Sequence, residues 1–241
     1  MTTTDLILLH GALGDSHQLA PLAERLNDGR RVTVIELPGH GTTTLGDASF
    51  GVETFSRSVL AEMARLGIAH ADFFGYSMGG YVALHLAAEA ADRVARVATL
   101  ATKLAWTPEV AKREAGMLDP GTIRAKVPKF AAALEARHTA LGWETLLERT
   151  AEMMHELGAR QIVTAEVLAR IAQPVRIAVG DRDATVTIDE CAAAVRQLPN
   201  GELEVHPRTP HPFEKAPVDR IARSLLEFLS FEGSDPLKPR V

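Results

Sequence analysis

The sequence has little of what marks secreted, membrane-spanning or nucleic-acid-binding proteins. Its single cysteine, Cys191, cannot form an internal disulfide, which suits a reducing cytosol, and we interpret it as a small buried hydrophobic residue. The formal net charge of −5 argues against nucleic acid or an anionic membrane as the main partner. No signal peptide is visible, and no apolar run approaches the length of a membrane span. We therefore expect a cytoplasmic protein that binds neither membrane nor nucleic acid.

Sequence motifs for the common cofactors are missing too. No G-x-G-x-x-G and no P-loop follows the first expected strand, and no His-Glu-x-x-His pair is present. Apolar residues make up 46% of the 241 positions, which is enough to bury the core of one compact domain. The sequence therefore predicts a single globular domain that uses neither a metal nor a cofactor.

What the sequence does contain is an alternation of strand and helix patterns. Short apolar runs rich in β-branched residues predict strands at 6–9, 31–37, 71–76, 94–101, 174–180 and 202–206. Helical patterns fill most of the intervals, at 17–26, 53–67, 78–91, 187–198 and, after the last strand, 217–231. This order predicts an α/β fold with about six parallel strands and helices on both faces of the sheet.

Residues 103–170 interrupt the alternation, because no strand pattern occurs there. The segment reads as several helices separated by prolines and glycines. An insertion after the fourth strand would lie above the carboxyl ends of the strands, where ligands bind in open α/β sheets. We therefore predict a helical cap at 103–170 on a catalytic core formed by 1–102 and 171–241, with a loosely ordered tail from 233.

The cap holds most of the candidates for an apolar substrate pocket. Its large apolar side chains are expected to line that pocket: Trp106, Met117, Phe130, Trp143, Met153 and Met154. His17, after the first strand, is a further candidate. The alternative is that the cap residues pack the small core of the cap itself, and that His17 only begins a helix.

The motif GYSMGG at residues 75–80 carries the strongest chemical signal. It follows an expected strand, opens an expected helix and fits Gly-x-Ser-x-Gly, in which the serine lies on a tight strand-to-helix turn. This context predicts that Ser77 is a nucleophile and that the backbone N–H of Met78 faces the reacting oxygen. A second such N–H is expected from Ala12 in the loop HGALGD, where His10 has a structural role.

A serine hydroxyl needs a histidine base that is oriented by a carboxylate. After the GYSMGG motif, two carboxylates, Asp181 and Asp183, follow a strand in VGDRD, and His211 follows the last strand. Either aspartate with Ser77 and His211 gives the order Ser, Asp, His at the carboxyl ends of strands. Among the other histidines, His70, His138 and His155 are interpreted as helix-surface or loop residues.

With these motifs, the chain resembles the α/β-hydrolase superfamily, and in particular its compact, capped, esterase-like serine hydrolases. The resemblance rests on HGALGD, ELPGHG, GYSMGGYVALHLA, VGDRD and TPHPFEK, which occur in the family's order. It implies that Asp183, three residues after Gly180, is the acid of the triad. It also implies Ser77 as nucleophile, His211 as base, and Ala12 and Met78 as oxyanion donors. Family members commonly begin with an antiparallel hairpin, which has no counterpart here.

The expected activity is hydrolysis of a carboxylic ester of a small molecule through an acyl-enzyme. One alternative keeps the triad for carbon–carbon hydrolysis, lyase or perhydrolase chemistry, because the fold does not fix the function. Another is a ligand receptor on the same scaffold. The expected partner is a small-molecule substrate, and the chain is expected to be a monomer or a homodimer.

Overall fold

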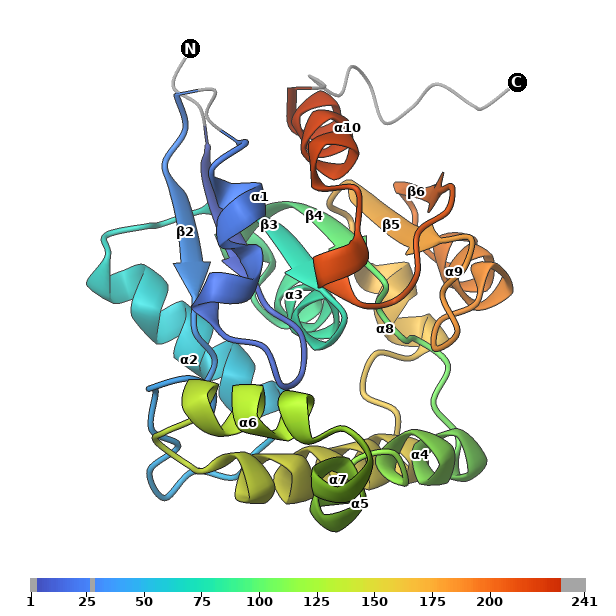
Figure 1. Cartoon of the computed structure of the whole chain (residues 1–241). Coiled ribbons are helices and arrows are strands. Elements are labelled where there is room, and N and C mark those ends of the chain that lie inside the picture. The colour runs from blue at the N-terminus through green and yellow to red at the C-terminus, as the bar shows by residue number, and fades with distance from the viewer. Residues whose placement is uncertain (1–3, 27–28, 231–241) are drawn as a thin grey trace.

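The computed structural model describes residues 4–26 and 29–230, which form an α/β fold around one parallel sheet (Figure 1). The strand order is β2-β1-β3-β4-β5-β6, and all five strand pairings are parallel. The strands are β1 (Asp5–Leu9), β2 (Val32–Ile35), β3 (Ala71–Tyr76), β4 (Val94–Leu100), β5 (Val175–Gly180) and β6 (Gly201–His206). The predicted fold class is confirmed, and each strand lies within a residue or two of the expected range.

Each face of the sheet is covered by its own set of helices. Along β1, Leu6 and Leu8 point to one face, while Ile7 and Leu9 point to the other, and all are fully buried. This double burial explains why the strands are apolar without alternation. The face of Ile7 packs against α2 (Val52–Arg65), α3 (Met78–Glu89), α8 (Ala165–Arg170) and α9 (Ile188–Val195). The face of Leu6 packs against η1 (Ser16–Leu19), α1 (Ala20–Ala23) and α10 (Val218–Ser230).

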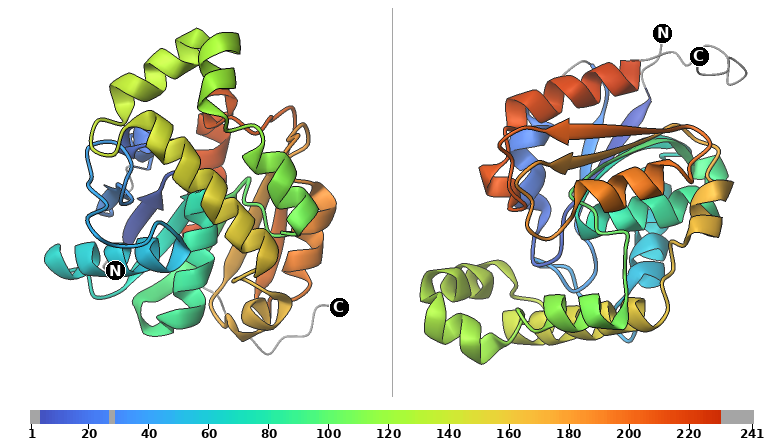
Figure 2. Two further views of the ribbon diagram at one scale, coloured as in Figure 1. Left: turned by 90° about the horizontal axis from the view of Figure 1, so that it is seen from below. Right: turned by 90° about the vertical axis from the view of Figure 1, so that its right-hand side faces the viewer.

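Most of the segment predicted as a cap lies beyond the strand ends (Figures 1 and 2). Its helices are α4 (Pro108–Ala115), α5 (Pro120–Lys126), α6 (Pro128–Arg137) and α7 (Trp143–Ala159). In Figure 1 the arrowhead of β2 points toward α6 and the rest of this layer. The remaining helix of 103–170 is α8. It contributes Leu168 to the large core on the face of the sheet to which Ile7 points. The layer formed by α4 to α7 is called the cap below.

The cap has a small core of its own. Buried side chains from three of its helices form it: Ile123, Ala131, Leu134, Trp143 and Leu147. Prolines stand at the first positions of α4, α5 and α6, where the missing N–H costs nothing. Within residues 4–26 and 29–230, no helix has the length and apolar character needed to cross a bilayer. The expected tail from 233 and the last residue of the expected helix at 217–231 lie outside the described residues.

Candidate active site

Ser77 occupies a tight turn between β3 and α3. Its φ of 50° lies in the left-handed region, which is unfavourable for a residue with a side chain. The turn is held by the backbone bond from Ser77 N–H to the Leu100 carbonyl at 2.8 Å. The helix passes so close to β1 that a β-carbon at Gly79 would come within 2.2 Å of the Leu9 carbonyl oxygen. Gly79 therefore allows the close approach of α3 to β1, which places Ser77 at the end of β3 with its side chain at the cavity described below.

The structure brings Ser77, His211 and Asp183 into one chain of contacts. The Ser77 Oγ lies 3.5 Å from His211 Nε2, and His211 Nδ1 lies 2.8 Å from Asp183 Oδ2. The Asp183 side chain is fully buried, whereas the His211 side chain remains 24% exposed. Asp181 points elsewhere, because its Oδ1 accepts the N–H of Thr209 at 3.2 Å. The geometry thus distinguishes the two aspartates that the spacing alone left open.

Two further contacts fix the histidine and its carboxylate. Asp183 Oδ1 accepts the backbone N–H groups of Thr185 and Val186, each at 2.8 Å, so its other oxygen faces the imidazole. The Tyr76 hydroxyl, at the end of β3, donates to the carbonyl of His211 at 2.8 Å. Hydrogen bonds of this kind orient the ring before any substrate arrives.

A small cavity of about 50 Å³ opens beside Ser77. The residues that line it come from the core loops and from the cap: Ala12, Val52, Ser77, Met78, Tyr81, Lys103, Trp106, Met153, Met154 and Leu157. Among the pocket candidates, Trp106, Met153 and Met154 lie here, together with the two expected oxyanion residues, Ala12 and Met78. The wall is mainly apolar, which suits the uncharged part of a small molecule.

The other four pocket candidates do not line this cavity. Trp143 is buried in the core of the cap, where its indole packs between α5, α6 and α7. Met117 and Phe130 are exposed to solvent, with 59% and 44% of their area accessible. The His17 side chain is 87% exposed and pairs with Asp15 at 3.2 Å. The pocket expectation is wrong for these residues, since a helical pattern does not show which face of a helix turns inward.

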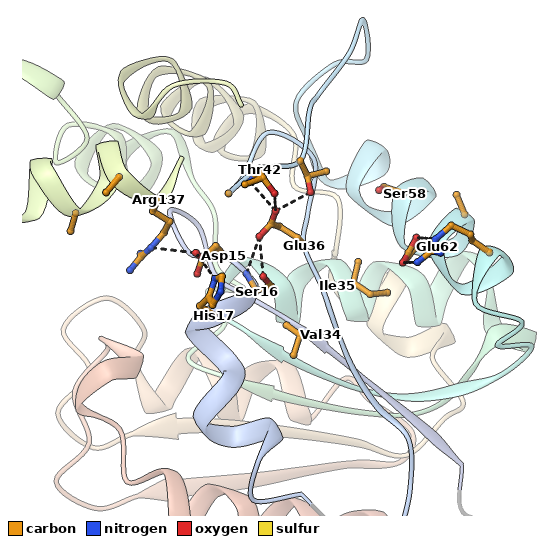
Figure 3. Close-up of a pocket in the computed structure, with 16 residues that line it drawn as sticks. Asp15, Ser16, His17, Val34, Ile35, Glu36, Thr42, Ser58, Glu62 and Arg137 are labelled. Carbon is orange, nitrogen blue, oxygen red and sulfur yellow. Dashed lines mark hydrogen bonds and ion pairs between the residues drawn. The ribbon is translucent and has the colours of Figure 1, made fainter. Parts of the chain in front are cut away.

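A larger groove, of about 930 Å³, lies on another part of the molecule (Figure 3). It runs between η1, the end of β2, α2 and α6, and none of Ser77, Asp183 and His211 lines it. Its walls carry charges of both signs, including Glu36, Glu62, Arg65 and Arg137. The Glu36 carboxylate is already occupied by the hydroxyls of Ser16, Thr42 and Thr43. Ser77 thus borders the small cavity and does not border this groove.

Four residues of the cavity wall were not among the sequence candidates: Val52, Tyr81, Lys103 and Leu157. Tyr81 lies one turn after Ser77 on α3, and its hydroxyl accepts the N–H of Val163 at 2.9 Å. Lys103 lies three residues after the end of β4, and its buried ammonium donates to the Thr185 carbonyl at 2.8 Å and to Glu190 at 3.2 Å. The position of Lys103 shortly after a strand end was a usable signal for a site residue.

The histidines outside the triad divide into buried and exposed ones. Burial lowers the pKa of His10 to about 4 and the pKa of His40 well below its usual value, and it also lowers the pKa of His138. These three rings lie close together, with centroids of His10 and His138 at 4.9 and 6.0 Å from that of His40. His138 follows the end of α6 and so lies in a loop, one of the two expected placements, but only 1% of it is accessible. His70 and His155 are exposed as expected.

Comparison with known proteins identifies the family of this chain. The family model described as alpha/beta hydrolase fold matches residues 5–156, well over half of the sequence. The chain is also 30% identical, over 95% of both proteins, to a pimeloyl-[acyl-carrier protein] methyl ester esterase of Chromobacterium violaceum. The protein therefore belongs to the α/β-hydrolase family, as the motifs had indicated.

Other relatives match over shorter stretches or in structure alone. A dihydrolipoyllysine-residue acetyltransferase component of the acetoin cleaving system of Pseudomonas putida is 37% identical over 99 residues. That match covers 41% of this chain but only 27% of the longer relative. The crystal structure of the enol-lactonase from Burkholderia xenovorans LB400 superimposes with a TM-score of 0.76 at 22% identity, covering 95% of this chain and 92% of that one. At this level of sequence identity, the structural similarity to the enol-lactonase shows a shared fold alone.

Proposed function

We propose that the protein hydrolyses a carboxylic ester of a small molecule, with Ser77 as nucleophile, His211 as general base and Asp183 as the orienting acid. The observation that carries this proposal is the continuous contact Ser77–His211–Asp183, with distances of 3.5 and 2.8 Å. The names of relatives add support, because the full-length relative from C. violaceum is a methyl ester esterase. We do not extend to this protein the pimeloyl-[acyl-carrier protein] ester in the name of that relative.

The reaction begins when His211 Nε2 accepts the proton of the Ser77 hydroxyl as the oxygen attacks the ester carbonyl. Asp183 accepts the hydrogen bond from Nδ1–H of His211, which keeps Nε2 free to accept that proton and stabilises the imidazolium that forms. The imidazolium then protonates the departing alcohol, leaving an acyl group on Ser77. A water molecule deprotonated by His211 releases the acid and restores the serine.

The negative oxygen of the tetrahedral intermediate requires hydrogen-bond donors. We assign this role to the backbone N–H groups of Met78 and Ala12, since both residues border the cavity that contains Ser77. Met78 is the first residue of α3, so no carbonyl of a preceding helical turn takes up its N–H. The positive end of the helix dipole favours negative charge at the same place.

The cavity limits the acyl group that can be accepted. Its volume of about 50 Å³ is several times the roughly 10–15 Å³ that one water molecule requires. The walls contributed by Met153, Met154 and Leu157 are apolar. The favoured substrates are therefore esters of short, uncharged acids with a few carbon atoms.

The test is hydrolysis of p-nitrophenyl esters graded by acyl length, with Ser77→Ala beside the wild type. We expect the short esters to be turned over fastest, and the Ser77→Ala variant to lose at least ~10⁴-fold in kcat. Ser58→Ala is the matched control, because Ser58 lines the larger groove and should leave turnover unchanged. Unchanged hydrolysis by a clean Ser77→Ala preparation would refute the assignment.

Labelling with a fluorophosphonate separates the competing functions. An activated serine reacts with one equivalent of the reagent, so we expect one label on Ser77 in the wild type and none in Ser77→Ala. Labelling without turnover of any ester would favour carbon–carbon hydrolysis, lyase or perhydrolase chemistry on the same triad. Absence of both labelling and turnover would favour a ligand receptor.

A further inference from the structure

Leu13, next to the proposed oxyanion residue Ala12, has a backbone conformation that is unusual for leucine. Residues 11–14 form a tight turn closed by the bond from Gly14 N–H to the Gly11 carbonyl at 3.1 Å. Leu13 is the third residue of this turn and has a φ of 60°, a value that glycine adopts far more readily. A turn of this kind persists only where its surroundings hold it in place.

The groups that hold Leu13 come from the cap. Its carbonyl oxygen accepts Arg137 Nη1 at 3.0 Å and contacts His138 Nε2 at 3.0 Å. Arg137 is the last residue of α6, and its side chain also reaches Asp15, as Figure 3 shows. The Leu13 side chain packs against the core of the cap. Both the backbone and the side chain of Leu13 are therefore held by the cap, and the two contacts to its carbonyl come from residues 124 and 125 positions later in the sequence.

His138 makes a second bond that defines its protonation state. Its Nδ1 accepts the backbone N–H of Gly41 at 2.9 Å, so the proton of the neutral ring is on Nε2 and is donated to Leu13. The next residue, Thr139, donates its N–H to the Gly41 carbonyl at 3.0 Å. Burial lowers the pKa of His138, which favours the neutral ring that these two bonds require. His138 thus joins two loops of the core to one point of the cap.

We propose that Arg137 and His138 are positioning residues that hold the Leu13 carbonyl and thereby aim the Ala12 N–H at the oxyanion. This inference rests on the proposed function, since the oxyanion role of Ala12 belongs to it. The two side chains do not touch the reacting atoms. They act through the intervening Ala12–Leu13 peptide unit, because the Leu13 carbonyl and the Ala12 N–H lie on either side of it in the turn closed by the bond from Gly14 N–H to the Gly11 carbonyl. The oxyanion site is then complete only when the cap is seated.

Two substitutions of His138 separate its two hydrogen bonds. In His138→Gln the amide nitrogen can occupy the place of Nε2 and donate to Leu13, although the acceptor for Gly41 is lost. In His138→Asn the amide oxygen can replace Nδ1 and accept from Gly41, but the shorter side chain cannot reach Leu13. The two variants remove one bond each and are similar in polarity. A difference between them therefore reports on the contact with Leu13.

We expect His138→Asn to lower kcat on a short p-nitrophenyl ester by about 10–30-fold, and His138→Gln by less than about 3-fold. The Asn effect is smaller than the roughly 10²–10³-fold loss of a whole oxyanion donor, because Arg137 still holds the Leu13 carbonyl. KM should change by less than about 3-fold in both variants, since the oxyanion bonds strengthen only in the transition state. His155→Asn, on an exposed cap residue, is the control and should equal the wild type.

Hydrogen exchange of the backbone amides in residues 11–14 supplies a readout that needs no ester. His138→Asn and Arg137→Met should exchange faster there than the wild type, and His138→Gln should exchange more slowly than His138→Asn. Arg137→Met also serves if His138→Asn does not fold, because the Arg137 side chain is partly exposed and its loss leaves His138 in place. For this variant we expect kcat to fall by about 3–10-fold.

The results separate the two proposals. If the wild type turns over esters, equal kcat values of His138→Asn and His138→Gln would overturn the positioning role. A lower melting temperature of the variants without any loss of kcat would overturn it too. If the wild type hydrolyses no ester, the proposed function fails, and the exchange rates alone decide whether the cap holds Leu13. Unchanged exchange at residues 11–14 in both His138→Asn and Arg137→Met would then reject the inference.

Discussion

The core and the cap both contribute to the site around Ser77, but they do so in different ways. The core supplies groups whose positions follow from backbone geometry: Ser77 on its strained turn, Asp183 after β5 and His211 after β6. The cap supplies part of the cavity wall from α7, and contacts to Leu13 from the end of α6 and the residue after it. Under the proposed function, the core would therefore fix the chemistry, whereas the cap would control which molecules reach it and when the oxyanion site is complete.

The contrast between the two aspartates after β5 gives the largest expected effect. In Asp183→Asn, the amide oxygen would continue to accept from Thr185 and Val186, which leaves the NH₂ group facing His211 Nδ1. That arrangement favours the tautomer with the proton on Nε2, so the imidazole can no longer accept the proton of Ser77. We expect kcat to fall by about 10⁴-fold, measured with a short p-nitrophenyl ester.

Asp181→Asn is the matched control for this substitution. Asp181 accepts only a backbone N–H at 3.2 Å from Thr209, a bond that an amide oxygen can also make. We therefore expect less than about a 3-fold change in kcat, together with an unchanged melting temperature. A larger loss in Asp181→Asn than in Asp183→Asn would mean that the contact pattern assigns the wrong carboxylate.

The fold could be predicted from the sequence, and candidates for a triad could be named, because the strands and the turn at Ser77 depend on strict backbone requirements. A strand buried on both faces must be apolar throughout, as in β1, and a sharp strand-to-helix turn requires small residues such as Gly79 around its serine. The choice of Asp183 over Asp181 needed either the family's spacing or coordinates. Both residues follow the same strand, and only the path of the loop decides which carboxylate turns toward His211.

The positions of the large cap side chains could not be predicted from the sequence, for a physical reason. Its large side chains could pack inside the cap, line the cavity or face solvent, and the helical pattern is compatible with all three outcomes. Trp143 packs inside the cap, Met154 lines the cavity and Phe130 is exposed to solvent. The contacts of His138 could not be predicted, because its partners are backbone groups of Leu13 and Gly41, and any residue type has these groups. Contacts between distant segments therefore had to come from the structure.

Two neighbouring methionines of α7 allow the role of the cap as a size filter to be tested. Met153 is buried to 5% exposure in the large core as well as bordering the cavity, whereas Met154 is only partly buried. Met154→Ala should enlarge the cavity and shift the kcat/KM ratio of a longer to a shorter acyl ester about 10-fold toward the longer one. A methylene group in an apolar pocket is worth about 1–3 kcal/mol.

Met153→Ala should instead lower the free energy of unfolding by about 2–5 kcal/mol, because it leaves a hole in a packed core. Chemical denaturation of both variants measures this difference. If Met154→Ala left the ratio of acyl esters unchanged while turnover remained high, the cavity beside Ser77 would not be the acyl site, and the limit on substrate size would be wrong.

The smallest expected effect concerns an exposed side chain of the cap. Phe130 is 44% exposed and lies outside the cavity, so Phe130→Ser should change the free energy of unfolding by less than about 0.5 kcal/mol and leave kcat/KM unchanged. Trp143→Ala, in the core of the cap, should cost about 3–5 kcal/mol in the same denaturation experiment. A loss of activity in Phe130→Ser without loss of stability would mean that Phe130 contacts the substrate although it does not line the cavity beside Ser77. Retained activity would agree with a contribution of the cap through the cavity wall and the support of Leu13.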